Sequence, residues 1–216
     1  MLYATLGYEY KLWNEGKTLV CGIDEVGRGC FAGPVVAGAV IFSPDSKVPD
    51  GIADSKLLKP SKREKLADEI KASALDFAIA EIDVETINEV GIGKATQLAF
   101  LNAVNCLKNY PEFFLIDAFH IQGLDKSIQN PIKAGDKLSV SIAAASIIAK
   151  VYRDELMSKL DGDFPGYGFA RHKGYGTKDH RDAIGKLGLC DLHRKSFNLG
   201  KFIGIKVSTK GDPFRG

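Results

Sequence analysis

The stretch "VCGIDEVGRGCFAGPVVAGAVIF", residues 20–42, contains two runs of β-forming residues joined by a glycine-rich turn. Two adjacent acids, Asp24 and Glu25, stand where the apolar pattern of the first run would continue. Gly27, Arg28 and Gly29 follow almost at once. The stretch therefore predicts two neighbouring strands, with polar residues at their turn that a strand pair alone does not require.

Further strands and helices are predicted on both sides of this pair. Residues 73–83 predict a third strand, and "EFFLIDAF" predicts a buried strand that ends at Asp117. Apolar residues at helical spacing predict helices over residues 91–108 and 137–160. Residues 59–73 are charged with helical spacing, and they place Ser61 as an N-cap with Glu64 at the capping-box position. This order predicts an α/β protein whose mixed sheet is covered by helices.

The composition changes near residues 160–177, which are rich in glycine and aromatic residues. We take this segment as a joint, which predicts a catalytic domain over residues 1–165 and a small basic, helical extension over residues 166–216. Residues 171–216 hold 11 Lys and Arg against 4 Asp and Glu, whereas residues 1–170 hold 18 against 23. The extension could grip a polyanion, although a solvated basic tail would have the same composition.

The composition also excludes several classes of protein. The chain has 216 residues, of which 45% are hydrophobic and 26% charged, which is typical of a soluble globular protein. No run approaches the roughly 18 apolar residues of a membrane-spanning helix, and the N-terminus does not resemble a signal peptide. The four cysteines and four histidines show no zinc-binding spacing. We expect a cytoplasmic protein with reduced thiols, in which any metal site is built from carboxylates.

Four acids are candidates for such a site: Asp24, Glu25, Asp117 and Asp136. Strand ends and helix starts gather at one edge of an α/β sheet, and parallel neighbours would place Asp24 beside Asp117. Clustered carboxylates repel one another unless a cation lies between them. Oxygen ligands suit Mg²⁺ or Mn²⁺, and two such ions about 4 Å apart form the clamp used for displacement at phosphorus.

Each acid also has a simpler interpretation. Asp136 could cap a helix that begins at Lys137, and Asp117 could bond to a turn. Glu25 could face solvent, because successive strand side chains point to opposite faces. The glycine turn is not a dinucleotide-binding loop, because its G-x-G-x-x-x-G spacing is one residue too long and leads into a strand. Its glycines allow close approach of the backbone to a ligand, and Arg28 suits phosphate.

Five motifs in one order resemble bacterial ribonuclease HII, the type 2 ribonuclease H family. They are "GIDEVGRGCFAGPVVAGAV", "LIDAF", "KAGDKLSVSIAAASIIAKVYRD", "FPGYGFARHKGYGTKDH" and "LHRKSF", and they run from about residue 20 to about residue 200. The resemblance implies a ribonuclease H-like fold, a five-stranded mixed sheet with flanking helices and a helical C-terminal extension. Two departures stand beside the acids: "KAGD" replaces the commoner Lys-Gly-Asp, and Ala118 replaces a common Gly. Only 19 residues precede Val20, which favours ribonuclease HII over the related HIII group.

The resemblance also implies the site and its chemistry. It assigns Asp24, Glu25, Asp117 and Asp136 as metal ligands for a two-metal Mg²⁺ or Mn²⁺ site. It assigns substrate contact to Gly27, Arg28 and Gly29 and to Tyr175 of "HKGYGT". The expected reaction is hydrolysis 5′ to a ribonucleotide, in RNA:DNA hybrids and at single ribonucleotides in duplex DNA, leaving a 3′-hydroxyl and a 5′-phosphate.

The basic residues of the extension complete this interpretation. Arg171, Lys173 and Lys178 are expected to hold duplex phosphates. We expect a monomer that does not bind membranes. Two alternatives stay open from the sequence: another nuclease of this fold, such as a junction resolvase, and a nucleic-acid-binding module without catalysis.

Overall fold

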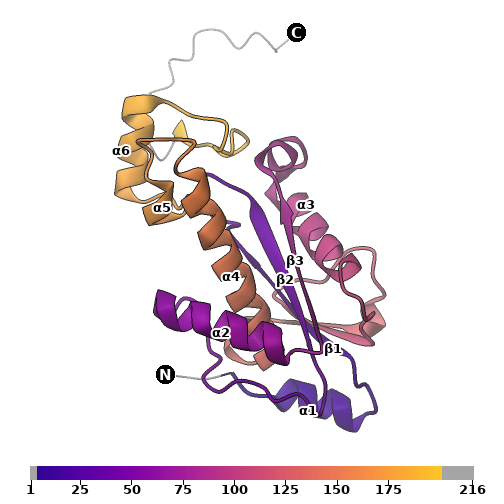
Figure 1. The fold of residues 1–216 in the computed structure, drawn as a ribbon. Coiled ribbons are helices and arrows are strands. Elements are labelled where there is room, and N and C mark those ends of the chain that lie inside the picture. Colours follow the sequence, from indigo (N-terminus) through magenta and orange to yellow (C-terminus); the bar gives the residue numbers. More distant parts are fainter. Residues whose placement is uncertain (1–3, 201–216) are drawn as a thin grey trace, which may run out of the picture.

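The protein is described by a computed structural model that covers residues 4–200 (Figure 1). A five-stranded sheet has the strand order β3-β2-β1-β4-β5. The strands are β1 (Val20–Val26), β2 (Val35–Phe42), β3 (Asp76–Ile82), β4 (Phe113–Asp117) and β5 (Gln129–Ile132). β1, β2 and β3 pair antiparallel, while β4 and β5 continue the sheet parallel to β1. The prediction of a mixed five-stranded sheet is confirmed.

Helices cover both faces of this sheet and extend beyond one end of it (Figure 1). α3 packs on one face, against alternate residues of the strands that include Ile23 and Ile116. α4 and α2 pack on the other face, and α1 covers its edge. The helices are α1 (Gly7–Asn14), α2 (Pro60–Ser73), α3 (Val84–Asn105), α4 (Val140–Leu160), α5 (Phe169–His172) and α6 (Lys178–Leu187). None of these helices, within the part of the chain that is described, has the length and apolar character needed to cross a membrane.

Two glycines let α4 lie directly on the sheet. A Cβ added to Gly22 of β1 would lie 2.1 Å from the backbone carbon of Ser141, and one added to Gly38 of β2 would lie 2.4 Å from the backbone oxygen of Ala145. Both distances are shorter than any van der Waals contact, so no other residue fits at either position without moving the helix. The N-terminal half of α4 is therefore held against the strands that carry the first acids.

The helix boundaries correct two predictions. Ser61 is not the N-cap of α2; Lys59 occupies that position, Pro60 begins the helix, and no side chain caps it. Proline is favoured at a first helical position because its missing N–H has no partner there anyway. α3 begins seven residues before the predicted start at residue 91, with Asp83 as N-cap, and Gly91 marks a kink at φ 81°.

The segment after α4 forms a separate group of helices at one end of the molecule (Figure 1). α5 and α6 enclose a small apolar cluster with Ala32 and with Met157 of α4. The predicted domain boundary at residues 165 and 166 falls in the turn between α4 and α5, and residues 201–216 of the predicted extension lie outside the described residues.

Candidate active site

Asp24 and Asp117 lie side by side at the ends of two parallel strands. Ile23 of β1 is paired with Ile116 of β4, so the next residue of each strand is one of the two acids. Because side chains alternate along a strand, both acids point to the face covered by α4 rather than to the α3 face. The predicted juxtaposition of these two residues is confirmed.

Asp24 is enclosed by α4 and by the other acids. It is 5% exposed, it accepts a hydrogen bond from the Glu25 backbone N–H at 2.7 Å, and Ser146 of α4 lies near enough to lower its pKa. Burial, followed by the negative charges of Glu25, Asp117 and Asp136, raises the pKa of Asp24 well above its usual range. The ionised form of this carboxylate therefore needs a positive charge beside it.

Asp136 reaches the site through a short turn that is bonded to Asp117. The Gly135 N–H donates to Oδ1 of Asp117 at 2.7 Å, and Gly135–Lys137 forms a single 3-10 turn, η2. The N-cap of α4 is Ser139, whose side chain accepts from the Ile142 N–H. The interpretation of Asp136 as a helix cap is therefore wrong, because the helix begins four residues after it.

Asp136 is also surrounded by charge. Burial raises its pKa, and Asp54 and Asp117 raise it further. Lys56 opposes them, with its Nζ 4.0 Å from Oδ2 of Asp136. Asp54 and Lys56 come from the loop between β2 and α2, and nothing in their sequence pattern pointed to this site.

Glu25 faces the acids and not the solvent. Burial raises the pKa of Glu25 to about 7, with Arg28 lowering it and Asp117 raising it. Its Oε2 atom is buried and has no hydrogen-bond partner. The solvent-facing interpretation of Glu25 is wrong, because its Oε2 atom is buried and its carboxylate is close enough to Asp117 for the two charges to repel each other.

The donor set fits a hard divalent cation. Carboxylate oxygens are the ligands that Mg²⁺ and Mn²⁺ prefer, and the orphaned Oε2 of Glu25 is an oxygen in need of a positive partner. The raised pKa values of Asp24, Glu25 and Asp136 are what uncompensated neighbouring carboxylates produce. Within residues 4–200, no three His, Cys, Asp or Glu side chains are already drawn together around one metal position.

The two alanines that depart from the family pattern both have left-handed backbone. Ala118, directly after Asp117, has φ 61°, and Ala134, two residues before Asp136, has φ 56°. This conformation costs a residue with a Cβ roughly 1–2 kcal/mol. The strain lies in the two turns that carry the acids, where the chain must reverse within a few residues.

The glycine-arginine turn combines a crowded glycine with an open one. Gly27 has φ 89°, and a Cβ there would lie 2.2 Å from Nε of Arg153. Gly29 is exposed, with open space where a Cβ would point. The Arg28 guanidinium lies over the Phe119 ring at 4.5 Å, and its backbone carbonyl accepts from Arg194 at 2.9 Å. The turn thus presents bare backbone next to a cation.

Tyr175 lies in the loop between α5 and α6 and is 36% exposed. Burial raises the pKa of its hydroxyl to about 12, and the nearby Cys30 thiol raises it further. The flanking glycines do not serve flexibility: a Cβ on Gly174 would lie 2.2 Å from the Ala32 carbonyl oxygen, and one on Gly176 would lie 2.3 Å from the Phe31 ring. They let the loop pack tightly on the segment that follows the glycine-arginine turn, so Tyr175 and Arg28 belong to one assembly.

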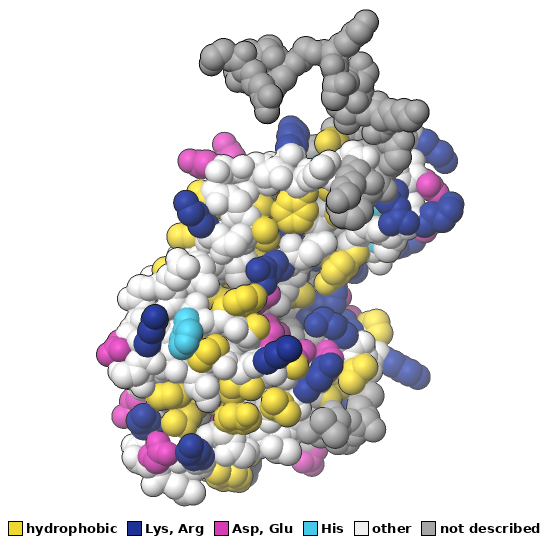
Figure 2. Space-filling view, turned by 180° about the vertical axis from the view of Figure 1, so that it is seen from behind, with side chains coloured by type: hydrophobic (Ala, Val, Ile, Leu, Met, Phe, Trp, Pro, Cys, Tyr) yellow, Lys and Arg dark blue, Asp and Glu magenta, His cyan; other side chains and the backbone are white. Residues whose placement is uncertain are grey.

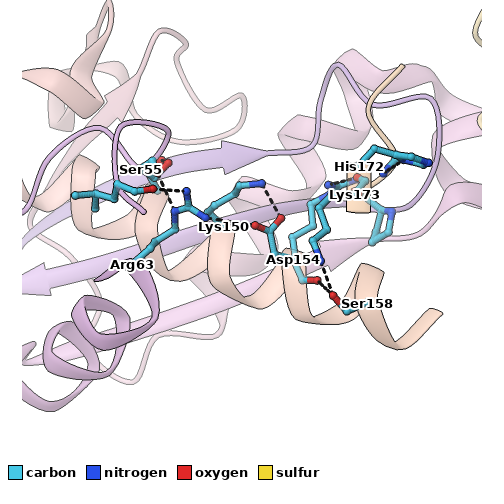
Figure 3. A network of polar contacts seen from close by, with 12 residues as sticks. Ser55, Arg63, Lys150, Asp154, Ser158, His172 and Lys173 are labelled. Carbon is cyan, nitrogen blue, oxygen red and sulfur yellow. Dashed lines mark hydrogen bonds and ion pairs between the residues drawn. The ribbon is translucent and has the colours of Figure 1, made fainter. Parts of the chain in front are cut away.

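A row of charged side chains lies along α4, from Arg63 of α2 past Lys150 and Asp154 to Lys173 (Figure 3). Lys150 is 5.4 Å from the centre of the Tyr175 ring and donates to Asp154 at 2.6 Å, and Arg63 of α2 also bonds to Asp154, at 3.4 Å. Further along, Lys173 bonds to Ser158. No sequence pattern predicts this row, because its members come from two helices and a loop.

The three basic residues expected to hold phosphates differ in their freedom. Arg171 and Lys178 are exposed, and Lys178 is paired with Asp182 at 2.8 Å, whereas Lys173 is half-buried beside Ser158. Figure 2 shows a hollow between the C-terminal helices and the sheet, where acidic and basic side chains gather.

Comparison with known proteins identifies the family of this chain. The family model described as Ribonuclease HII matches residues 21–199. The chain belongs to the ribonuclease HII family. Ribonuclease HII of Clostridioides difficile is 50% identical over 190 residues, which cover 88% of this chain and 74% of that protein. Ribonuclease HII of Caldicellulosiruptor bescii is 45% identical over 189 residues, which cover 88% of this chain and 91% of that protein.

Solved structures related to ribonuclease HII have the same fold. Ribonuclease H2 of Pyrococcus horikoshii matches with a TM-score of 0.71 at 24% identity, covering 86% of this chain and 97% of that one. Bst-RNase HIII, solved in complex with Mn²⁺, matches with a TM-score of 0.64 at 21% identity, covering 87% of this chain and 69% of that one. The predicted family and ribonuclease H-like fold are confirmed, and the chain is an endoribonuclease of the ribonuclease H type, which acts on RNA paired with DNA.

Proposed function

We propose that this ribonuclease HII hydrolyses the phosphodiester 5′ to a ribonucleotide, both in RNA:DNA hybrids and at single ribonucleotides in duplex DNA. The products are a 3′-hydroxyl and a 5′-phosphate. The observation that supports this proposal is the convergence of four acids beside the glycine-arginine turn, with the buried Oε2 of Glu25 lacking a partner. Asp24 and Asp117 stand at adjacent strand ends, and Asp136 joins them through the Gly135 bond.

Asp24, Glu25, Asp117 and Asp136 would hold two divalent cations, Mg²⁺ or Mn²⁺. When bound, such a pair stabilises the charge that develops on the attacking and leaving oxygens of a phosphodiester. Asp24 would be central to holding them, because its carboxylate interacts with the charges of all three other acids. The hydrogen bonds from the Glu25 N–H and the Gly135 N–H orient Asp24 and Asp117.

Selection of RNA requires a contact with the 2′-hydroxyl of the sugar. The exposed backbone at Gly29 and the ring and hydroxyl of Tyr175 are the groups proposed to make it, with Arg28 on the neighbouring phosphate. Gly27 packs against the Arg153 side chain and Gly174 against the Ala32 carbonyl oxygen. This packing holds the glycine-arginine turn and the Tyr175 loop at a constant separation. Arg171, Lys173 and Lys178 would hold the phosphates of the duplex beyond this point.

The test uses a DNA duplex that carries one ribonucleotide. With Mg²⁺, the wild-type protein is expected to cut once, on the 5′ side of the ribonucleotide. Asp24→Asn is expected to lower cleavage by orders of magnitude and to bind the duplex at least as tightly, because one negative charge near phosphate is removed. Near-normal cleavage by Asp24→Asn would refute the assignment of the metal ligands. Cleavage at DNA junctions without a ribonucleotide would instead identify a resolvase.

A further inference from the structure

Three histidines that are far apart in the sequence meet beneath the loop that carries Tyr175. His172 comes from α5, His180 from α6, and His193 from the segment after α6; all three are buried. The rings of His172 and His180 stack at 4.3 Å with an angle of 12° between their planes. Nε2 of His180 lies 3.1 Å from Nε2 of His193. The proposed chemistry uses none of these side chains.

The proton positions in this group follow from one backbone carbonyl. The Tyr175 carbonyl can only accept, so Nδ1 of His180, 2.9 Å away, must donate. A neutral imidazole has one N–H, so Nε2 of His180 accepts and Nε2 of His193 donates to it. Nδ1 of His193 must then be an acceptor, and the Cys190 backbone N–H donates to it at 2.9 Å. The four groups form a chain of hydrogen bonds with a single direction.

This chain of hydrogen bonds requires the imidazoles of His180 and His193 to be neutral, and burial favours the neutral form of both. Burial lowers the pKa of His180 and of His193 to about 4. Neighbouring basic side chains act in the same sense, since His172 lowers the pKa of both rings and Lys195 lowers that of His193. At neutral pH the donor and acceptor roles are therefore fixed.

The chain of hydrogen bonds ends on the backbone of the loop that carries Tyr175. The Tyr175 carbonyl accepts a hydrogen bond from His180, and the Gly174 N–H donates to Nδ1 of His172 at 3.2 Å. Two stacked imidazoles thus hold the peptide group before Gly174 and the one after Tyr175, two residues apart in the loop. The Tyr175 side chain leaves this backbone toward Cys30 and Lys150 and is 36% exposed.

We propose that His180 is a positioning residue that sets the Tyr175 ring for recognition of the ribose, and that His193 selects the tautomer of His180 that can do so. A group that reads one hydroxyl must be held within about 0.5 Å of its working position by its supporting side chains. The partner of one imidazole nitrogen decides which nitrogen carries the proton, and the His193 N–H decides it here. This inference rests on the proposed role of Tyr175 in the function above.

A matched pair of variants separates positioning from packing. His180→Asn places an amide N–H near the former Nδ1 and keeps the bond to the Tyr175 carbonyl, but it loses the partner of His193. His180→Gln places its amide near the former Nε2, keeps the partner of His193 and loses the bond to Tyr175. Both variants remove one buried bond of the chain, so a purely structural role predicts equal effects.

The readout is kcat/KM on a duplex with one ribonucleotide. We expect His180→Gln to lose about 10- to 100-fold, mostly in kcat, because a displaced ring misaligns the substrate while the phosphate contacts persist. We expect His180→Asn to stay within about threefold of wild type. Equal losses in the two variants would overturn the proposal. Phe164→Leu, in the same apolar cluster, controls for lowered melting temperature without a change in this chain.

Combining His180→Gln with Tyr175→Ala separates the positioning role of His180 from the sugar-reading role of Tyr175. If His180 acts through Tyr175, His180→Gln adds no further loss once the ring is absent; an undiminished further loss refutes the positioning role. If Tyr175→Ala and Tyr175→Phe both cleave like wild type, the sugar-reading role fails and the positioning role fails with it. If they lose activity while His180→Gln does not, only the positioning role is refuted.

Discussion

Replacing Glu25 with glutamine should stabilise the metal-free protein at alkaline pH. The pKa of Glu25 is about 7 in the folded protein, because the side chain is buried beside Asp117, and its ordinary value of 4.5 applies to the unfolded chain. The unfolded chain therefore releases this proton at lower pH than the folded chain does, so folding stability declines as pH rises from 4.5 to about 7. Each pKa unit corresponds to about 1.4 kcal/mol, which gives a loss of at most about 3.5 kcal/mol above pH 7.

Glu25→Gln cannot ionise and should avoid this loss. In EDTA near pH 8 its melting temperature should exceed that of wild type by roughly 6–10 °C, and near pH 4.5 the two should agree. Thermal unfolding followed by circular dichroism across this range, with Glu89→Gln as an exposed control, measures the difference. Mg²⁺ should raise the melting temperature of wild type more than that of the variant. Parallel pH curves for wild type and Glu25→Gln would refute the account of a strained, cation-seeking carboxylate.

Three further outcomes are expected. Gly22→Ala should cost about 3 kcal/mol or more in urea unfolding, because its Cβ would lie 2.1 Å from backbone of α4; a loss below 1 kcal/mol would show that the helix can move away. Neutralising Arg171, Lys173 and Lys178 together should reduce the salt dependence of duplex binding by roughly one unit of slope per lost phosphate contact, with the cleavage position unchanged. Since burial lowers the pKa of His193 to about 4, wild type should lose stability as pH falls from 6.5 toward 4, and His193→Gln should lose less; an equal decline would place the acid sensitivity elsewhere.

Local pattern was enough to predict four of the five strands and to single out the four acids as candidates, whereas the fifth strand, β5, followed only from the family resemblance. The β-rich runs around residues 20–42 predicted adjacent strands, and a buried strand ending at Asp117 predicted its neighbour, because strand patterning is a short-range property. The motifs then assigned the family, which the match over residues 21–199 confirms. Their order and spacing carry this information without any coordinates.

The start residues of the helices were harder to predict from the sequence, because neighbouring residues compete for the N-cap position. Ser61 had the pattern of a cap, yet Pro60 begins α2 one residue earlier. Taken alone, Asp136 had the pattern of a helix cap and only the family resemblance favoured metal binding; the position of Ser139 at the start of α4 excludes the cap. Residues that compete for one role within a few positions cannot be ranked by type alone.

The sequence by itself determined which residues this protein has available for chemistry: the acids at the strand ends, the glycine-arginine turn and the tyrosine between two glycines. Only the tertiary structure decided what supports them. His172, His180 and His193 have no regular spacing, Asp54 lies in the loop between β2 and α2, and Ser146 and Lys150 lie on α4. Hydrogen bonds and charge interactions depend on distance in space and not on distance along the chain. The groups that fix proton positions and orient Tyr175 and the acids can be identified only from the packing of α4 and the C-terminal helices beside the sheet.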